Sequence, residues 1–282
     1  MAKLYVIATP IGNIGDITER AKQTLNEVDF IVAEDTRNSG ILLNRLGIKK
    51  QLISYHKFNE KERSATIIEK ILSGKTCAIV TDAGTPCISD PGSVLVRECA
   101  QNGIEIIGIP GASAVVLALS VCGFDVDNFA FYGFFPRTKG EIKEFLEKFE
   151  SDSIKIGVFY ESPKRIEDTL SVISSVLPNS KLCLCNDLTK KFERIYRGDA
   201  DEIIEMLKNN DKSELGEYAL VIENQKETKQ AEQSCAVSVE ARIFDKVYSG
   251  MDVKSAVKQL HQEGVPRNDA YQAGLHVKEM LK

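Results

Sequence analysis

Short apolar runs alternate with amphipathic stretches along the first 120 or so residues of the chain. The runs have the length of strands, and the stretches between them carry apolar residues at helical spacing. Strands that alternate with helices predict a parallel, doubly wound α/β sheet. The five predicted strands lie at 3–9, 30–33, 52–55, 77–80 and 104–109.

The pattern changes after Gly123, where strands follow one another more closely. This spacing predicts a second α/β domain with a mixed sheet. Ser162 followed by Pro163 predicts the start of a helix, because serine caps helices well and proline suits the first helical position. Strands are predicted at 129–134, 154–160, 181–188, 193–197 and 217–223, and an amphipathic helix at 139–150.

The last part of the chain has a different pattern. Residues 225–236 are polar and without periodicity, which predicts a linker. Apolar residues then recur at helical spacing in two stretches separated by Gly264 and Pro266, which predicts a small helix–turn–helix appendage over 237–282. The predicted domains are therefore 1–122 and 123–224, followed by the linker and the appendage.

Composition narrows the class of protein. With 43% apolar and 27% charged residues, the chain suits a soluble globular protein, and no apolar run approaches the roughly 20 residues of a membrane span. The chain enters a strand directly, so we expect no signal peptide. Seven cysteines, an odd number without metal-ligand spacing, indicate reduced thiols in a cytoplasmic protein that binds no metal.

Charge says little about a nucleic-acid partner. The net charge of −5 argues against a general nucleic-acid footprint but leaves room for a local basic patch. Over residues 241–282, seven Lys and Arg stand against five Asp and Glu. This small excess makes RNA contact by the appendage a hypothesis, and the alternative is a packing element.

Polar residues and glycines follow every predicted strand of the first sheet. Each has a structural alternative, such as a helix cap or a turn, but parallel strands share one carboxyl edge, so together they predict a cleft. The spacing Gly12-x-x-Gly15 is not that of a dinucleotide loop, and no P-loop is present, so we expect a ligand without phosphates. A sulfonium-bearing adenosyl ligand suits carboxylates and close backbone approach. The strand-end residues are Pro10, Gly12, Asp35, Arg37, His56, Asp82, Gly84, Thr85, Pro110, Gly111 and Ser113.

Six short motifs occur in order along the chain: Thr9-Pro10-Ile11-Gly12-Asn13, Ala33-Glu34-Asp35-Thr36-Arg37, Asp82-Ala83-Gly84-Thr85-Pro86, Asp90-Pro91-Gly92, Pro110-Gly111 and Phe159-Tyr160-Glu161-Ser162. Together they resemble the ribosomal small-subunit RNA methyltransferase I family of the tetrapyrrole-methylase superfamily. The resemblance covers about 1–224 and is fainter over the tail. It implies S-adenosylmethionine-dependent 2′-O-methylation of a decoding-site cytidine in 16S rRNA, a cofactor cleft between two α/β domains, and a homodimer.

The resemblance also implies which residues form the site. One departure is the pair Asn186-Asp187, which stands where the family usually has Arg-Glu before Leu-Thr-Lys. The implied cofactor contacts are Pro10, Asp82, Ala83, Gly84, Thr85, Ser113, Ala114, Tyr160, Leu188 and Ala219.

The reaction itself needs further groups. A ribose hydroxyl is a weak nucleophile, so a base or a nearby cation would assist it. The candidates, among which the sequence does not choose, are Asp35, His56, Glu161 and Lys190. Candidates for holding RNA phosphates are Arg37, Lys164 and Arg165.

Two other functions stay open at this point. One is C-methylation of a tetrapyrrole such as a precorrin or uroporphyrinogen, on the same fold and with the same cofactor. The other is a non-catalytic RNA- or nucleotide-binding regulator. The three basic residues named above and the helical tail favour RNA over a compact tetrapyrrole.

Overall fold

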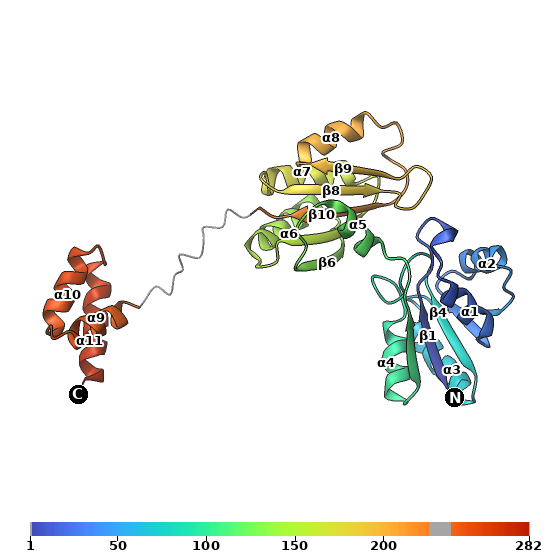
Figure 1. Ribbon diagram of the computed structural model, residues 1–282, viewed down its shortest axis with the longest axis horizontal. Helices are drawn as coiled ribbons and strands as arrows, with labels where there is room; N and C mark the ends of the chain where they lie inside the picture. The colour runs from blue at the N-terminus through green and yellow to red at the C-terminus, as the bar shows by residue number, and fades with distance from the viewer. Residues whose placement is uncertain (1, 226–237, 282) are drawn as a thin grey trace. The chain divides into compact units, whose positions relative to one another are not determined.

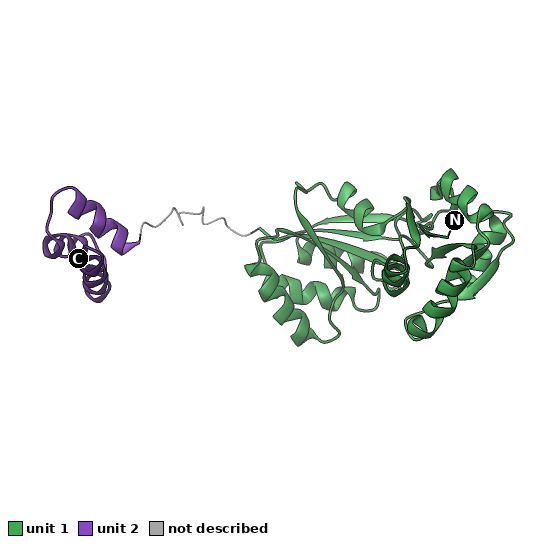
Figure 2. Ribbon diagram, turned by 90° about the horizontal axis from the view of Figure 1, so that it is seen from below, with its two compact units in different colours: residues 1–226 green, residues 227–282 purple. Residues whose placement is uncertain are grey.

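The computed structural model describes residues 2–225 and 238–281, and the chain divides into two compact units, 1–226 and 227–282 (Figure 2). The predicted linker at 225–236 lies outside the described residues except for Gln225. None of the described helices combines the length and the apolar character that a membrane crossing requires.

The first sheet of unit 1 is entirely parallel, with strand order β3-β2-β4-β1-β5. Its strands β1 and β4 lie side by side in Figure 1. Side chains alternate across it: Phe30 and Val32 join the core beneath α3 and α4, whereas Ile31 and Ala33 join the core beneath α1 and α2. Burial on both faces is the pattern of a doubly wound sheet, so the predicted fold class is confirmed for this half. The strands are β1 (Lys3–Ile7), β2 (Phe30–Ala33), β3 (Gln51–Ser54), β4 (Thr76–Val80) and β5 (Glu105–Ile109), and the helices are α1 (Glu19–Glu27), α2 (Thr36–Arg45), α3 (Glu60–Leu72) and α4 (Ser93–Gln101), with a short 3₁₀ turn η1 (Ile14–Asp16).

The second sheet of unit 1 is mixed, as predicted, in the order β6-β7-β10-β8-β9. The β6–β7 pair is parallel and the other pairs are antiparallel. One face is covered by α6, α7 and α8 and the other by α5. The strands are β6 (Phe129–Phe134), β7 (Ile156–Glu161), β8 (Lys181–Asn186), β9 (Arg194–Gly198) and β10 (Tyr218–Glu223), and the helices are α5 (Ala114–Cys122), α6 (Lys139–Ser151), α7 (Ile166–Val176) and α8 (Ala200–Lys208).

Helix α5 lies on the other side of the predicted domain boundary. A boundary after residue 122 assigns this helix to the first domain, but Val115, Ala118 and Cys122 pack on the second sheet, against side chains such as Val158 and Val221. The helix is apolar on nearly every side, so its sequence does not say which sheet it covers. The two sheets are therefore joined by the chain segment before α5.

Helix α7 begins later than Ser162-Pro163 predicted. Arg165, not Ser162, is its N-cap, and the amide of Arg165 donates to the Ser162 carbonyl in a preceding turn. The Ser162 amide is bound by the carboxylate of Glu161 at 2.7 Å. Residues 163–165 form a turn between β7 and the helix.

Unit 2 is a bundle of three helices, where two were predicted. The additional helix, α9, has Val239, Ile243 and Val247 at helical spacing, and Ile243 is fully buried in the core of the bundle. This core contains residues of unit 2 only, among the residues that the structure describes. The helices are α9 (Val239–Tyr248), α10 (Val253–Gln262) and α11 (Arg267–Met280).

Candidate functional site

A cavity of about 460 Å³ lies at the carboxyl edge of the first sheet and is lined by residues from both sheets of unit 1. The predicted cleft at this edge is thus present. Pro10 is not among the lining residues, although its neighbour Ile11 is. The other nine residues implied as cofactor contacts all line it: Asp82, Ala83, Gly84, Thr85, Ser113, Ala114, Tyr160, Leu188 and Ala219.

The floor of the cavity is the loop after β4, which is bound to its neighbours on both sides. Thr9 and Gly84 exchange two backbone hydrogen bonds, of 2.9 and 3.1 Å, and the Thr9 hydroxyl donates to the Thr81 carbonyl. The Thr85 hydroxyl donates to the Ala112 carbonyl at 3.2 Å. Gly84 has a φ of +84°, which favours glycine, so a ligand can approach its backbone closely.

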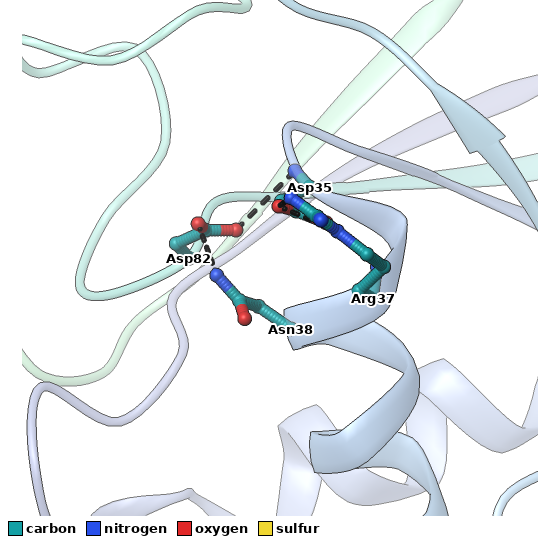
Figure 3. A network of polar contacts seen from close by, with 4 residues as sticks. All are labelled: Asp35, Arg37, Asn38 and Asp82. Carbon is teal, nitrogen blue, oxygen red and sulfur yellow. Dashed lines mark hydrogen bonds and ion pairs between the residues drawn. The ribbon is translucent and has the colours of Figure 1, made fainter.

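Asp82 belongs to a polar network at the edge of this loop (Figure 3). Its carboxylate accepts hydrogen bonds from the Asn38 amide at 2.7 Å and from the backbone N–H of Asp35 at 3.3 Å. Asp35 caps α2 and pairs with Arg37, Oδ2 to Nη2, at 2.6 Å. Hydrogen bonds from Arg37 lower the pKa of Asp35 to about 2, so Asp35 is a poor general base, and Arg37 is already paired with a carboxylate.

Glu161 lines the cavity but is a buried charge with its partners in place. Its side chain accepts hydrogen bonds from the Ser162 amide at 2.7 Å and the Thr169 hydroxyl at 2.8 Å, and pairs with Arg165 at 3.3 Å. Arg165 also donates to the Pro136 carbonyl. Glu161, a candidate base, and Arg165, a candidate phosphate ligand, are thus paired with each other.

The remaining basic candidates lie outside the cavity lining. His56 follows the edge strand β3, and its Nε2 lies 3.2 Å from the Asn59 amide nitrogen. Lys190 Nζ contacts Asp187 at 2.7 Å and Glu217 at 2.9 Å. Burial works to lower the pKa of Lys190, but these hydrogen bonds and charges outweigh it and raise the pKa, so the ammonium stays charged. The third phosphate candidate, Lys164, is exposed.

The Gly12 loop meets the loop after β8 at the side of the cavity. A Cβ at Gly12 would lie 2.5 Å from Lys190 Cγ and 3.0 Å from the Leu188 carbonyl oxygen. Asp187, at the position where the sequence departs from the family, holds this second loop: its carboxylate binds Lys190 and accepts from the Glu217 amide at 3.3 Å. An aspartate therefore has a defined structural role at position 187.

Sequence reasoning missed three carboxylates of the cavity, Asp90, Glu34 and Glu217. Asp90 and Glu34 stand in the motifs quoted above, but the path of the chain from Thr85 to Gly92 could not be predicted. Glu34 accepts a hydrogen bond from the Thr81 hydroxyl at 3.1 Å. Burial, and then the charge of Glu34, raise the pKa of the half-buried Asp90 to about 6.

Acidic groups outnumber basic ones along the cavity wall, where no Lys or Arg is among the lining residues. Such a wall suits a cationic ligand and does not suit a phosphate. In the described parts of the chain, no cluster of His, Cys, Asp and Glu could hold a metal ion. The carboxylates that line the cavity are Glu34, Asp82, Asp90, Glu161 and Glu217.

Comparison with known proteins defines the class. The family of Tetrapyrrole (Corrin/Porphyrin) Methylases matches residues 3–204, and the chain belongs to this family. It is a methyltransferase whose methyl donor is S-adenosylmethionine. The carboxylates, the tight Gly84 turn and the lack of a phosphate cradle fit such a donor.

Two proteins of known name are similar to this chain along nearly its whole length. The chain is 38% identical over 271 residues to the ribosomal RNA small subunit methyltransferase I of Halalkalibacterium halodurans, covering 95% of this chain and 93% of the relative. The protein of the same name from Bacillus subtilis is 37% identical over 283 residues, with 99% and 96% covered.

Solved structures agree on the fold. A diphthine synthase superposes with a TM-score of 0.60 at 14% identity, over 78% of this chain and 89% of that one. A uroporphyrin-III-C-methyltransferase from Thermus thermophilus gives a TM-score of 0.55 at 17% identity, over 79% and 95%. At these identities the likeness concerns the fold alone.

We predict that Glu161→Gln destabilises unit 1, because it leaves Arg165 without its charged partner. Breaking a buried pair on one side costs about 3 kcal/mol. Urea denaturation measures the loss. The double variant with Arg165→Met should recover part of it, since neither charge then remains.

Glu144→Gln is the matched control, because it removes a pair with Lys148 in which both side chains are exposed. Such exposed pairs contribute little to stability. If Glu161→Gln were as stable as the wild-type protein, the structural role assigned to Glu161 would be wrong.

Proposed function

We propose that this methyltransferase modifies the 16S rRNA of the small ribosomal subunit, at the 2′-oxygen of a cytidine in the decoding region. The observation that carries the proposal is the similarity to small-subunit rRNA methyltransferase I proteins along nearly the whole chain, including the three-helix tail. Five of the six motifs of that family contribute residues to one acidic cavity, which supports a shared reaction.

The tetrapyrrole alternative has weaker support. The uroporphyrin methyltransferase shares the fold at 17% identity and covers 79% of this chain, whereas the two rRNA methyltransferases described above match at 37–38% identity over 95% or more of it. From the family resemblance and the bacterial relatives, we further propose that the chain acts as a homodimer. We also propose that it works in the cytoplasm, where ribosomal subunits are assembled.

The cavity residues position the reactants. When bound, S-adenosylmethionine supplies a methyl group on a positively charged sulfur. The nine lining residues named above would hold it, and the carboxylates would favour its positive charge. Most of the rate then comes from alignment of the ribose oxygen with the methyl carbon, which the two rigid loops around Gly84 and Leu188 provide.

Asp90 is the base that the geometry favours. Asp35 is held ionised by Arg37, and Glu161 is occupied by three donors, whereas Asp90 lies half-buried in the cavity wall. A base works best when its pKa lies close to the operating pH, and that of Asp90 is about 6. Asp90 would accept the hydroxyl proton as the ribose oxygen takes the methyl group and the carbon–sulfur bond of the donor breaks, which would leave a neutral thioether.

The substrate assignment is tested in cells. Decoding-region fragments of 16S rRNA from cells with and without the gene should differ by one ribose methyl group on a cytidine, measured by mass spectrometry. Complementation with the gene should restore it. Identical fragments in the two strains would refute the proposal.

Asp90→Asn should lower methyl transfer about 100-fold or more, which is the usual contribution of a general base. The wild-type rate should rise with pH through about 6 as Asp90 loses its proton, and the variant should lack this rise. Initial rates at saturating cofactor between pH 5 and 8 measure both. The same rise in the variant would exclude Asp90.

Stability gives an independent check. The native pKa of Asp90, about 6, lies above its ordinary value of 3.8, so the native state holds this proton more tightly. That stabilisation is complete below pH 4 and is lost as the pH rises through 6. Relative to Asp90→Asn, the wild-type protein should therefore lose stability across this interval in denaturant titrations.

The three-helix tail should serve substrate binding. Among the described residues, its hydrophobic core contains side chains of unit 2 only. Tyr248 is 89% exposed, and the exposed Lys254 and Lys258 both lie on α10. Removal of residues 227–282 should leave the affinity for S-adenosylmethionine unchanged in calorimetry. Methylation of small subunits should fall, together with the salt dependence of binding, because phosphate contacts are lost. Loss of cofactor binding would contradict this role.

A further inference from the structure

Phe192 presents an exposed aromatic ring on the loop between β8 and β9, and two lysines lie against this ring. Lys191 is on the same loop, and Lys212 is on the loop between α8 and β10. Phe192 is 57% exposed, and the ammonium groups of Lys212 and Lys191 lie 4.5 and 5.5 Å from the centre of its ring. Neither lysine forms an ion pair with any residue that the structure describes. We call these three residues the Phe192 platform.

The loops that carry the platform are held in place by hydrogen bonds. In the first loop, the amide of Lys190 donates to the Asp187 carbonyl at 2.9 Å, and the amide of Glu193 donates to the Lys190 carbonyl at 3.1 Å. In the second, the Tyr218 phenol donates to the Ser213 carbonyl at 2.9 Å, beside Lys212. The platform is therefore presented in a defined position.

The same loops form part of the cavity. Leu188, four residues before Phe192, and Tyr218, whose phenol holds the Lys212 loop, both line it. Lys190 joins the two loops through its contacts with Asp187 and Glu217. A polymer whose reacting nucleotide occupies the cavity would have its adjoining nucleotides near the platform.

The chemistry of the platform matches single-stranded RNA. Bases stack on exposed aromatic rings whatever their identity, and lysines bind phosphates. Two of the three phosphate candidates predicted from sequence are already paired, Arg37 with Asp35 and Arg165 with Glu161. Asp211 and Glu214 lie on the Lys212 loop, so the local charge is mixed. Stacking should then contribute more than general attraction.

We propose that the Phe192 platform binds a nucleotide next to the one that is methylated. Its base stacks on the Phe192 ring, and a lysine displaced from the ring contacts a neighbouring phosphate. This inference rests on the proposed RNA substrate and adds a binding subsite outside the cofactor cavity.

The test uses the full-length chain and small ribosomal subunits from cells that lack the gene. Phe192→Ala should raise KM for the subunits about tenfold, as expected for one lost base stack, with little change in kcat. Phe192→Tyr should behave as the wild-type enzyme. Lys212→Gln should make KM less dependent on salt.

Phe129→Ala is the matched control, because Phe129 is a 45% exposed aromatic on the edge strand β6 and does not line the cavity. It should leave KM unchanged. Calorimetric affinity for S-adenosylmethionine and the oligomer size should be unchanged in Phe192→Ala.

Three results would overturn the inference. If KM is unchanged in Phe192→Ala while the wild-type enzyme methylates the subunits, the subsite is refuted and the proposed function stands. A change in oligomer size would make the platform a contact between copies of the chain. If the wild-type enzyme fails to methylate the subunits, the proposed function falls, and this inference falls with it.

Discussion

The close approach of the Gly12 loop to the loop after β8 is the contact on which the cavity depends. A Cβ at Gly12 would come within 2.5 Å of Lys190, so only a glycine lets the two loops meet as they do. Lys190 is in turn held by Asp187 and Glu217. This one contact ties the carboxyl edge of the parallel sheet to the mixed sheet. Leu188, on the loop after β8, lines the same cavity as Gly84.

Carboxylates of similar chemistry have different roles here because their surroundings differ. Asp35 is ionised by its pairing with Arg37, and Glu161 is a buried charge that orders the turn before α7. Asp90 has no arginine among its neighbours in the cavity wall, and burial raises its pKa to about 6. The arginines that neutralise the first two are thereby engaged, whereas the two lysines beside Phe192 form no ion pair with a described residue.

The two units of the chain have separate hydrophobic cores. In unit 1 the two sheets are packed by four clusters of apolar side chains, and the three helices of unit 2 share one of their own. The acidic cavity belongs wholly to unit 1. Such a division lets a compact cofactor site act on a substrate much larger than itself.

Local pattern determined much of this protein. Alternating apolar runs and helical stretches predicted the doubly wound sheet, and nine of the ten cofactor contacts implied by the family resemblance line one cavity. Tertiary structure decided what depends on partners distant in sequence. It placed the wholly apolar helix α5 on the second sheet, paired Glu161 with Arg165, and brought Asp90 beside Glu34. Periodicity reports which residues are buried, but a pKa or an ion pair depends on which side chains meet.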